Sequence, residues 1–194
     1  MTLHPSISQP KTWGANNFGM MAGALAVGVF AGLAASQSRK VIAQGPAIAA
    51  GNWVDALKAE HRMVEKLFQH LFETDDSQTM KRKMLLSKIA YALTKHANEE
   101  ENVVYPALAQ SSMTERADEM FHEHAQMKTA LYELKQMDAA QPQWLERARE
   151  LFELIGRHVQ EEESEVLPQL QASLSDEENR KLNLMMNWEG YKVA

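Results

Sequence analysis

Histidine and glutamate stand four residues apart at two places in this sequence. His96 is followed by Glu100, and sixty-two positions later His158 is followed by Glu162. On a helix, side chains four residues apart leave the same face one turn apart. Each pair therefore offers one imidazole nitrogen and one carboxylate oxygen, a combination that suits iron, zinc or manganese.

The two pairs belong to a longer repeat. Residues 96–106 and 158–168 share the histidine, three glutamates, a valine and a proline in register. One more histidine precedes each copy: His61 lies 35 residues before the first and His124 lies 34 residues before the second. Each copy of the repeat, together with the histidine before it, would form a hairpin of two helices. Two such hairpins, packed with approximate twofold symmetry, would bring four histidines and two glutamates to one level of a core. That set is sized for two metal ions.

The joint pattern favours a metal site where each residue alone would not. A single histidine is usually a packing or surface residue, and a run of glutamates is usually a solvated helix face. We expect the side chains of four glutamates to be exposed to solvent: Glu99, Glu101, Glu161 and Glu163. The other histidines of this part of the chain, His70 and His122, fall on other sides of their helices and should point away from the site.

Helices must position these residues, because apolar residues recur with a helical period from residue 52 onward and no alternating strand pattern appears. The predicted helices span residues 52–73, 79–109, 112–137, 142–170 and 175–188. Their start signals are Asn52, Pro142 and two capping boxes, Ser112 with Glu115 and Ser175 with Glu178. Short connections between long helices predict an all-α fold, an antiparallel up-down four-helix bundle with a short fifth C-terminal helix.

Composition limits the chemistry. The 194 residues include no cysteine, which excludes disulfides, thiolate zinc sites and iron–sulfur clusters. A metal must then be held by histidine and carboxylate. Residues 55–194 carry 17 basic and 26 acidic residues. An acidic domain repels phosphates, so we expect no nucleic-acid partner.

An uncharged stretch of nineteen residues, 18–36, lies near the N-terminus and is followed by Arg39 and Lys40. Nineteen helical residues at about 1.5 Å each span roughly the hydrocarbon core of a bilayer. We interpret the stretch as a transmembrane-type helix that anchors the chain. A secretory signal peptide and a helix that packs on protein are the alternatives.

The domain organisation follows from this anchor. Residues 1–40 form the N-terminal segment, 41–51 a linker, 52–186 the bundle and 187–194 a tail. Two small-x-x-x-small spacings in the anchor, Gly19 with Gly23 and Gly28 with Gly32, favour a homo-oligomer. We expect the inner membrane of a bacterium with the domain on the cytoplasmic side; export is the alternative.

Together these motifs resemble the hemerythrin-like HHE cation-binding domain, over residues 52–186. The resemblance rests on a histidine in the first helix, His-x-x-x-Glu-Glu with a following Tyr-Pro, a histidine in the third helix and a second His-x-x-x-Glu. It implies an up-down four-helix bundle with a non-haem di-iron centre, two iron ions that an oxo or hydroxo group can bridge. The ligands it implies are His61, His96, Glu100, His124, His158 and Glu162.

The sequence departs from the oxygen-carrying members of that family in the third helix. Those proteins have a second histidine one turn after the ligand, where this chain has Lys128. The matching position in the first helix is Glu65. We expect both side chains to face inward, either as a salt bridge beside the site or with Glu65 as an extra ligand. Tyr105 is either a phenol close to the iron or a packing residue beside Pro106.

Three functions follow from the resemblance. The first is binding of dioxygen or a related small oxidant, for oxygen binding, sensing or detoxification. The second is an enzyme with peroxidase-like or catalase-like activity. The third is a redox-responsive interaction module tethered to a membrane. Of these, a protein that binds metal and oxygen is favoured over an enzyme, with peroxidase-like activity as the alternative.

Overall fold

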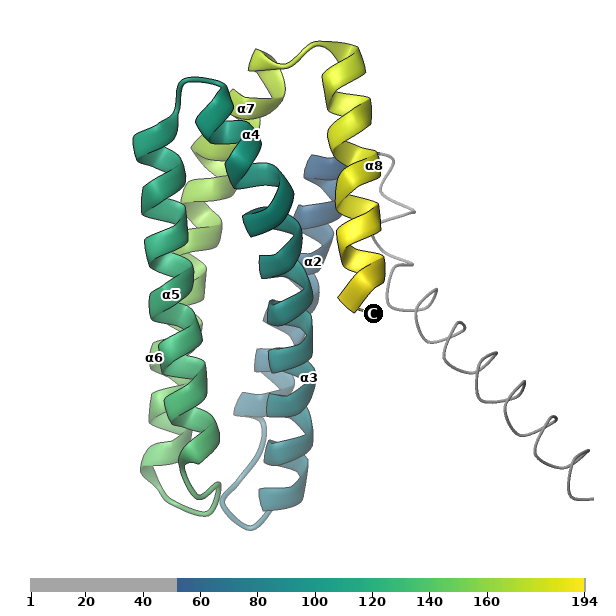
Figure 1. Cartoon of the computed structure of the whole chain (residues 1–194). Coiled ribbons are helices and arrows are strands. Elements are labelled where there is room, and N and C mark those ends of the chain that lie inside the picture. The colour runs from purple at the N-terminus through teal and green to yellow at the C-terminus, as the bar shows by residue number, and fades with distance from the viewer. Residues whose placement is uncertain (1–51, 194) are drawn as a thin grey trace, which may run out of the picture. The chain divides into compact units, whose positions relative to one another are not determined.

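The computed structural model describes residues 52–193, and within this range every regular element is a helix. Four long helices lie side by side, and helices consecutive in the chain run in opposite directions (Figure 1). They are α2 (Trp53–Phe72), α3 (Thr79–Glu99), α5 (Thr114–Gln136) and α6 (Gln143–Glu161). The prediction of an all-helical bundle is therefore confirmed.

Shorter elements extend two of the long helices and close the chain. A π-helical turn, η1 (Glu100–Val104), joins α3 to α4 (Tyr105–Gln110), and a second, η2 (Glu162–Val166), joins α6 to α7 (Leu167–Ser173). The last helix, α8 (Asp176–Val193), contacts α3, η1 and α2. It continues beyond the predicted end at Trp188, so residues 187–193 are helical and not an extended tail.

The predicted anchor, 18–36, and linker, 41–51, lie outside the residues that the structure describes. Between residues 52 and 193, no helix combines the length and the apolarity that a membrane crossing requires.

Two of the predicted helix starts have the expected caps. Asn52 accepts a hydrogen bond from the N–H of Asp55 at 3.0 Å, and Ser175 and Glu178 form the reciprocal bonds of a capping box. The box predicted at Ser112 is wrong. Ser112 has a positive φ of 66° and ends the preceding helix, and α5 begins two residues later.

The π-helical turns follow from the prolines of the repeat. In η1 the N–H of Tyr105 donates to the carbonyl of Glu100, five residues earlier, and the equivalent residues of η2 form the same bond. The next residue, Pro106, has no N–H, and its ring would clash with the carbonyl four residues earlier in an α-helix. The wider turn avoids that clash and places Tyr105 one turn above Glu100, on the same face.

Two apolar clusters fill the bundle, with a polar layer between them. One cluster includes Trp53, Leu57, Leu108 and Leu170, and lies toward α4, α7 and α8. The other includes Phe68, Leu86, Trp144 and Leu151, and lies toward the opposite end. The polar layer is therefore enclosed above and below by packed hydrocarbon, and its side chains are removed from water.

Arg82 ties the two loops together at the end of the bundle away from α8. Its guanidinium donates to the carbonyl of Ala139 at 2.6 Å and to the hydroxyl of Thr74 at 3.2 Å, and it stacks on the Trp144 ring. Only 3% of the residue is exposed. One buried cation thus connects the first hairpin to the second.

We expect Arg82→Met to lower the free energy of unfolding by about 2 kcal/mol, because hydrogen bonds from a buried charged group are lost and their acceptors are left unpaired. Urea unfolding measures the change. Arg147→Met is the matched control, since Arg147 forms only surface ion pairs and should change stability by less than about 1 kcal/mol. Equal losses in the two variants would contradict this role for Arg82.

Candidate metal centre

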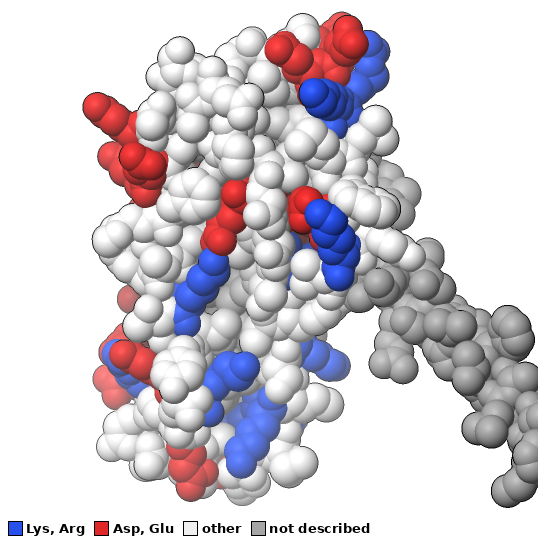
Figure 2. All heavy atoms as spheres, in the orientation of Figure 1, with Lys and Arg blue, Asp and Glu red and all other residues white. Residues whose placement is uncertain are grey.

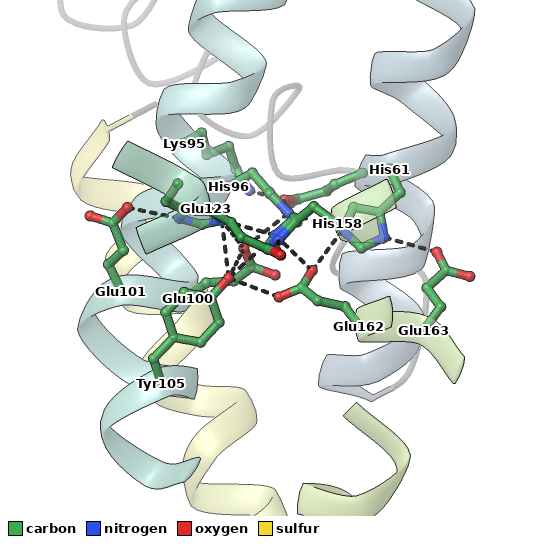
Figure 3. Close-up of polar contacts among 12 residues, drawn as sticks. His61, Lys95, His96, Glu100, Glu101, Tyr105, Glu123, His158, Glu162 and Glu163 are labelled. Carbon is green, nitrogen blue, oxygen red and sulfur yellow. Dashed lines mark hydrogen bonds and ion pairs between the residues drawn. The ribbon is translucent and has the colours of Figure 1, made fainter. Parts of the chain in front are cut away.

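The six residues expected as ligands come together inside the bundle, and Figure 3 labels all of them except His124. Each long helix supplies one histidine, and each π-helical turn supplies one glutamate at its first residue. All six are buried. The Nε2 atoms of His61 and His96 are 3.0 Å apart, and those of His124 and His158 are 3.1 Å apart. All four inner nitrogens therefore converge on the centre of the layer.

The two glutamates connect the histidines of one hairpin to those of the other. Glu100 Oε2 lies 3.1 Å from His96 Nε2 and 3.3 Å from His124 Nε2. Glu162 Oε2 lies 3.3 Å from His158 Nε2 and 3.5 Å from His61 Nε2. This arrangement defines two positions, a first between His61 and His96 and a second between His124 and His158, with both carboxylates between them.

The donors fit cations at these two positions. Glu100 Oε1 is buried and has no hydrogen-bond partner, and Glu162 Oε2 forms no hydrogen bond despite the two imidazoles beside it. A buried carboxylate oxygen without a partner is costly, and a coordinated cation removes that cost. Imidazole and carboxylate donors grouped around each position match the ligand preferences of iron, zinc and manganese.

A glutamate holds the outer nitrogen of every histidine. In the first hairpin, Nδ1 of His61 lies 2.8 Å from Glu163 and Nδ1 of His96 lies 3.1 Å from Glu60. In the second hairpin, Nδ1 of His124 lies 2.7 Å from Glu101 and Nδ1 of His158 lies 2.6 Å from Glu123. An Nδ1–H that donates to a carboxylate leaves the Nε2 lone pair free for a metal and fixes the ring. Glu60 and Glu123 each directly precede a histidine, and this repeated Glu-His dipeptide is a sequence signal that could have found them.

The prediction that the glutamate runs are solvated is wrong, because none of the four residues is exposed. Glu101 and Glu163 are half-buried and each binds a histidine, and Glu99 is 1% exposed. Glu161 is also half-buried, where it forms an ion pair with Arg116. The sequence spacing did not show this, because the histidines in question belong to the opposite hairpin.

Charges within the layer balance one another. Burial opposes ionisation of His158, but the carboxylates of Glu162 and Glu123 outweigh it and raise the pKa of His158 to about 10. Burial likewise opposes the charge of Glu162, yet His158 and His61 hold the pKa of this carboxyl well below its usual value. A cation bound beside His158 would displace the proton that this imidazole carries.

A buried lysine distinguishes the first hairpin from the second. Lys95 donates to Glu99 at 2.6 Å and also to Glu60, the glutamate that holds His96. Burial and the nearby charge of Glu60 raise the pKa of Glu99 to about 8. The equivalent of Lys95 in the second hairpin is Arg157, which is exposed. No sequence signal marked Lys95.

Tyr105 reaches into the site. Its hydroxyl lies 2.8 Å from Glu162 Oε1, 3.0 Å from His124 Nε2 and 3.4 Å from His158 Nε2. Burial and the two central carboxylates raise the pKa of Tyr105 well above its usual value, so the phenol stays protonated and donates. Its equivalent in the second hairpin is Leu167, so only the second position has a hydroxyl beside it.

The inward orientation predicted for Glu65 and Lys128 is wrong. Glu65 is exposed and accepts a hydrogen bond from Gln69, and the Lys128 side chain is 56% exposed. The buried seams of α2 and α5 continue through Val64 and Met127, three residues after the histidines, so a spacing of four falls off the seam. Lys128 nevertheless donates to Glu101, which in turn holds His124.

The two control histidines, His70 and His122, are both exposed, as predicted.

Comparison with known proteins agrees with the geometry. The model of the hemerythrin HHE cation-binding domain matches residues 52–170. A DNA nickase of Nostoc sp. (strain PCC 7120) is 28% identical over 130 residues, which are 67% of this chain and 36% of that protein. An uncharacterised hemerythrin-like protein of Schizosaccharomyces pombe is 31% identical over 128 residues, 64% of this chain and 62% of that protein.

No solved structure matches the chain, and the chain covers less than two thirds of the length of either relative. The family model, however, covers more than half of the chain and includes all six residues of the layer. The chain belongs to the family of hemerythrin-like proteins with an HHE cation-binding domain.

Proposed function

We propose that the polar layer is a di-iron centre. His61 and His96 hold one iron, His124 and His158 hold the other, and Glu100 and Glu162 lie between the two. One observation carries this proposal. The buried carboxylates of Glu100 and Glu162 each approach histidines of both hairpins, and one oxygen of each carboxylate lacks a hydrogen bond.

The centre serves, in this proposal, to bind dioxygen or a related small oxidant. Iron held there would supply electrons to an oxidant that reaches the layer. The chain's own residues shape the site: the outer glutamates fix the four imidazole rings, the two apolar clusters cover the layer above and below, and Tyr105 directs a hydroxyl at the second position. A cavity of about 340 Å³ reaches all four histidines from the surface and gives a small molecule access.

DNA cleavage, the activity in the name of the Nostoc relative, is not part of the proposal. The matched region is 36% of that protein. Acidic residues outnumber basic ones by 26 to 17 between residues 55 and 194. On the face shown in Figure 2, basic and acidic side chains are intermixed, with several basic ones gathered in the lower half. The overall excess of acidic residues opposes binding of a phosphate backbone.

We also propose that residues 18–36 tether the centre to a membrane, because nineteen uncharged residues followed by two bases suit a bilayer-spanning helix.

Replacing proposed ligands should lower the metal content. His96→Ala and Glu162→Ala should each reduce bound iron from two ions per chain to one or fewer, because each removes a donor from the layer. Iron is counted by elemental analysis after anaerobic loading. His70→Ala and His122→Ala are matched controls on exposed histidines and should keep two. Full iron content in both ligand variants would contradict the ligand assignment.

Visible absorption of the iron-loaded chain tests the function. Admitting air to the reduced protein should produce a new absorption that disappears when the gas is removed or a reductant is added, with dioxygen consumed in proportion to the iron pairs. Continued dioxygen release from added peroxide would instead favour a catalase-like enzyme. A spectrum that responds to neither oxidant would contradict the proposal.

Cell fractionation tests the tether. The whole chain should sediment with membranes and resist extraction by carbonate, whereas a chain from residue 41 onward should stay in the supernatant, since the proposed span is removed. Equal partitioning of both forms would contradict a membrane anchor at residues 18–36.

A further inference from the structure

The two sides of the bundle differ although the hairpins repeat. On one side, between α3 and α5, lies the cavity of about 340 Å³ that touches all four histidines. On the other side, between α2 and α6, a hollow of about 420 Å³ touches His61 alone among them. Approximate twofold symmetry would make these two openings alike, so their difference comes from the side chains that line them.

Aromatic residues pack together between α2 and α6. The rings of Phe68, Phe72 and Phe152 contact one another, with centroids 5.2 to 5.8 Å apart. In the repeat, Phe68 corresponds to Leu131 and Phe152 to Ala90. The hollow on the aromatic side has the larger volume, but of the two openings only the cavity between α3 and α5 touches all four histidines.

The cavity has an apolar body and a charged rim. Its walls include Leu93, Met127, Leu131 and Ile155, and its floor is formed by the histidines. Lys128 lines it together with Glu101 and is 56% exposed. The opposite hollow has Glu65 at the position equivalent to Lys128. Lys128 and Glu101 thus line the cavity that reaches all four histidines, whereas Arg62 and Glu65 line the hollow that does not.

The size of the cavity exceeds what a diatomic gas needs. At about 30 Å³ for each water-sized group, 340 Å³ holds about eleven such groups. This volume lies in the range of sites for small organic ligands, which combine apolar walls with a few polar groups. The Lys128 ammonium has three donors, and Glu101 occupies part of this capacity. A carboxylate at the rim can share the rest.

We propose that this cavity binds a medium-chain fatty acid, with its carboxylate at Lys128 and its alkyl chain extending along the apolar walls toward the histidines. The inference deepens the proposed function, because it places the far end of an organic molecule at the metal positions. Binding itself requires only the walls and Lys128, so it is measurable whether or not the centre reacts with dioxygen.

Calorimetry of the full chain with octanoate and with octanol tests the proposal, on samples whose iron content is known. The wild-type chain should bind one octanoate and should bind octanol more weakly. Lys128→Met should weaken octanoate about fivefold, the size expected of one exposed ion pair, and leave octanol unchanged. Lys66→Met, at an exposed lysine of α2, is the matched control and should change neither.

Leu131→Trp tests the position of the chain. Leu131 is half-buried at the cavity wall, so a larger ring should fill the cavity, abolish binding of both ligands and leave the iron content intact. The proposal is overturned if the wild-type chain binds neither ligand, if Lys128→Met weakens both equally, or if Leu131→Trp binds as the wild type does. Iron with reversible dioxygen uptake but no octanoate binding would remove only this inference. Octanoate binding without iron would remove only the proposed function.

Discussion

Everything in this bundle depends on two carboxylates that are fully buried between layers of hydrocarbon. Glu100 and Glu162 have no exposed surface. A buried charge is tolerated only when it is paired and hydrogen-bonded. The four imidazoles supply the pairing, and an outer ring of glutamates holds the imidazoles. The apolar clusters on both sides then decide how strong these interactions are, because they keep water away.

The repeated hairpin supplies most of the residues of the site, and the positions at which the two copies differ make the two halves of the site unequal. The repeat places one histidine on each long helix and one glutamate on each π-helical turn. Among the equivalent positions that differ are Tyr105 with Leu167, Lys95 with Arg157, and Lys128 with Glu65. The first two make the surroundings of the two candidate positions unequal, and the third places a lysine at one opening and a glutamate at the other. The two sides of an approximately twofold arrangement therefore differ.

The sequence alone predicted the helices and the six central residues, because spacing within one helix follows from regular geometry. It failed where the outcome depends on how the hairpins face each other. Glu101 and Glu163 bind histidines across that interface, and Lys95 is buried by tertiary packing. No sequence pattern within its own helix identifies any of these three residues. Lys128 was misplaced because the buried seam of α5 advances by three residues after His124, not by four. The predicted helix over residues 79–109 did not include the π-helical turn that aims Tyr105.

The bridging geometry has a consequence for assembly. Since each central glutamate approaches one histidine from its own hairpin and one from the other, neither hairpin contains a complete position by itself. A cation bound there joins segments 62 residues apart, as a disulfide would, but this cross-link can be reversed by protons or by a chelator. In a chain without cysteine, cation supply would then set how firmly the two halves stay together.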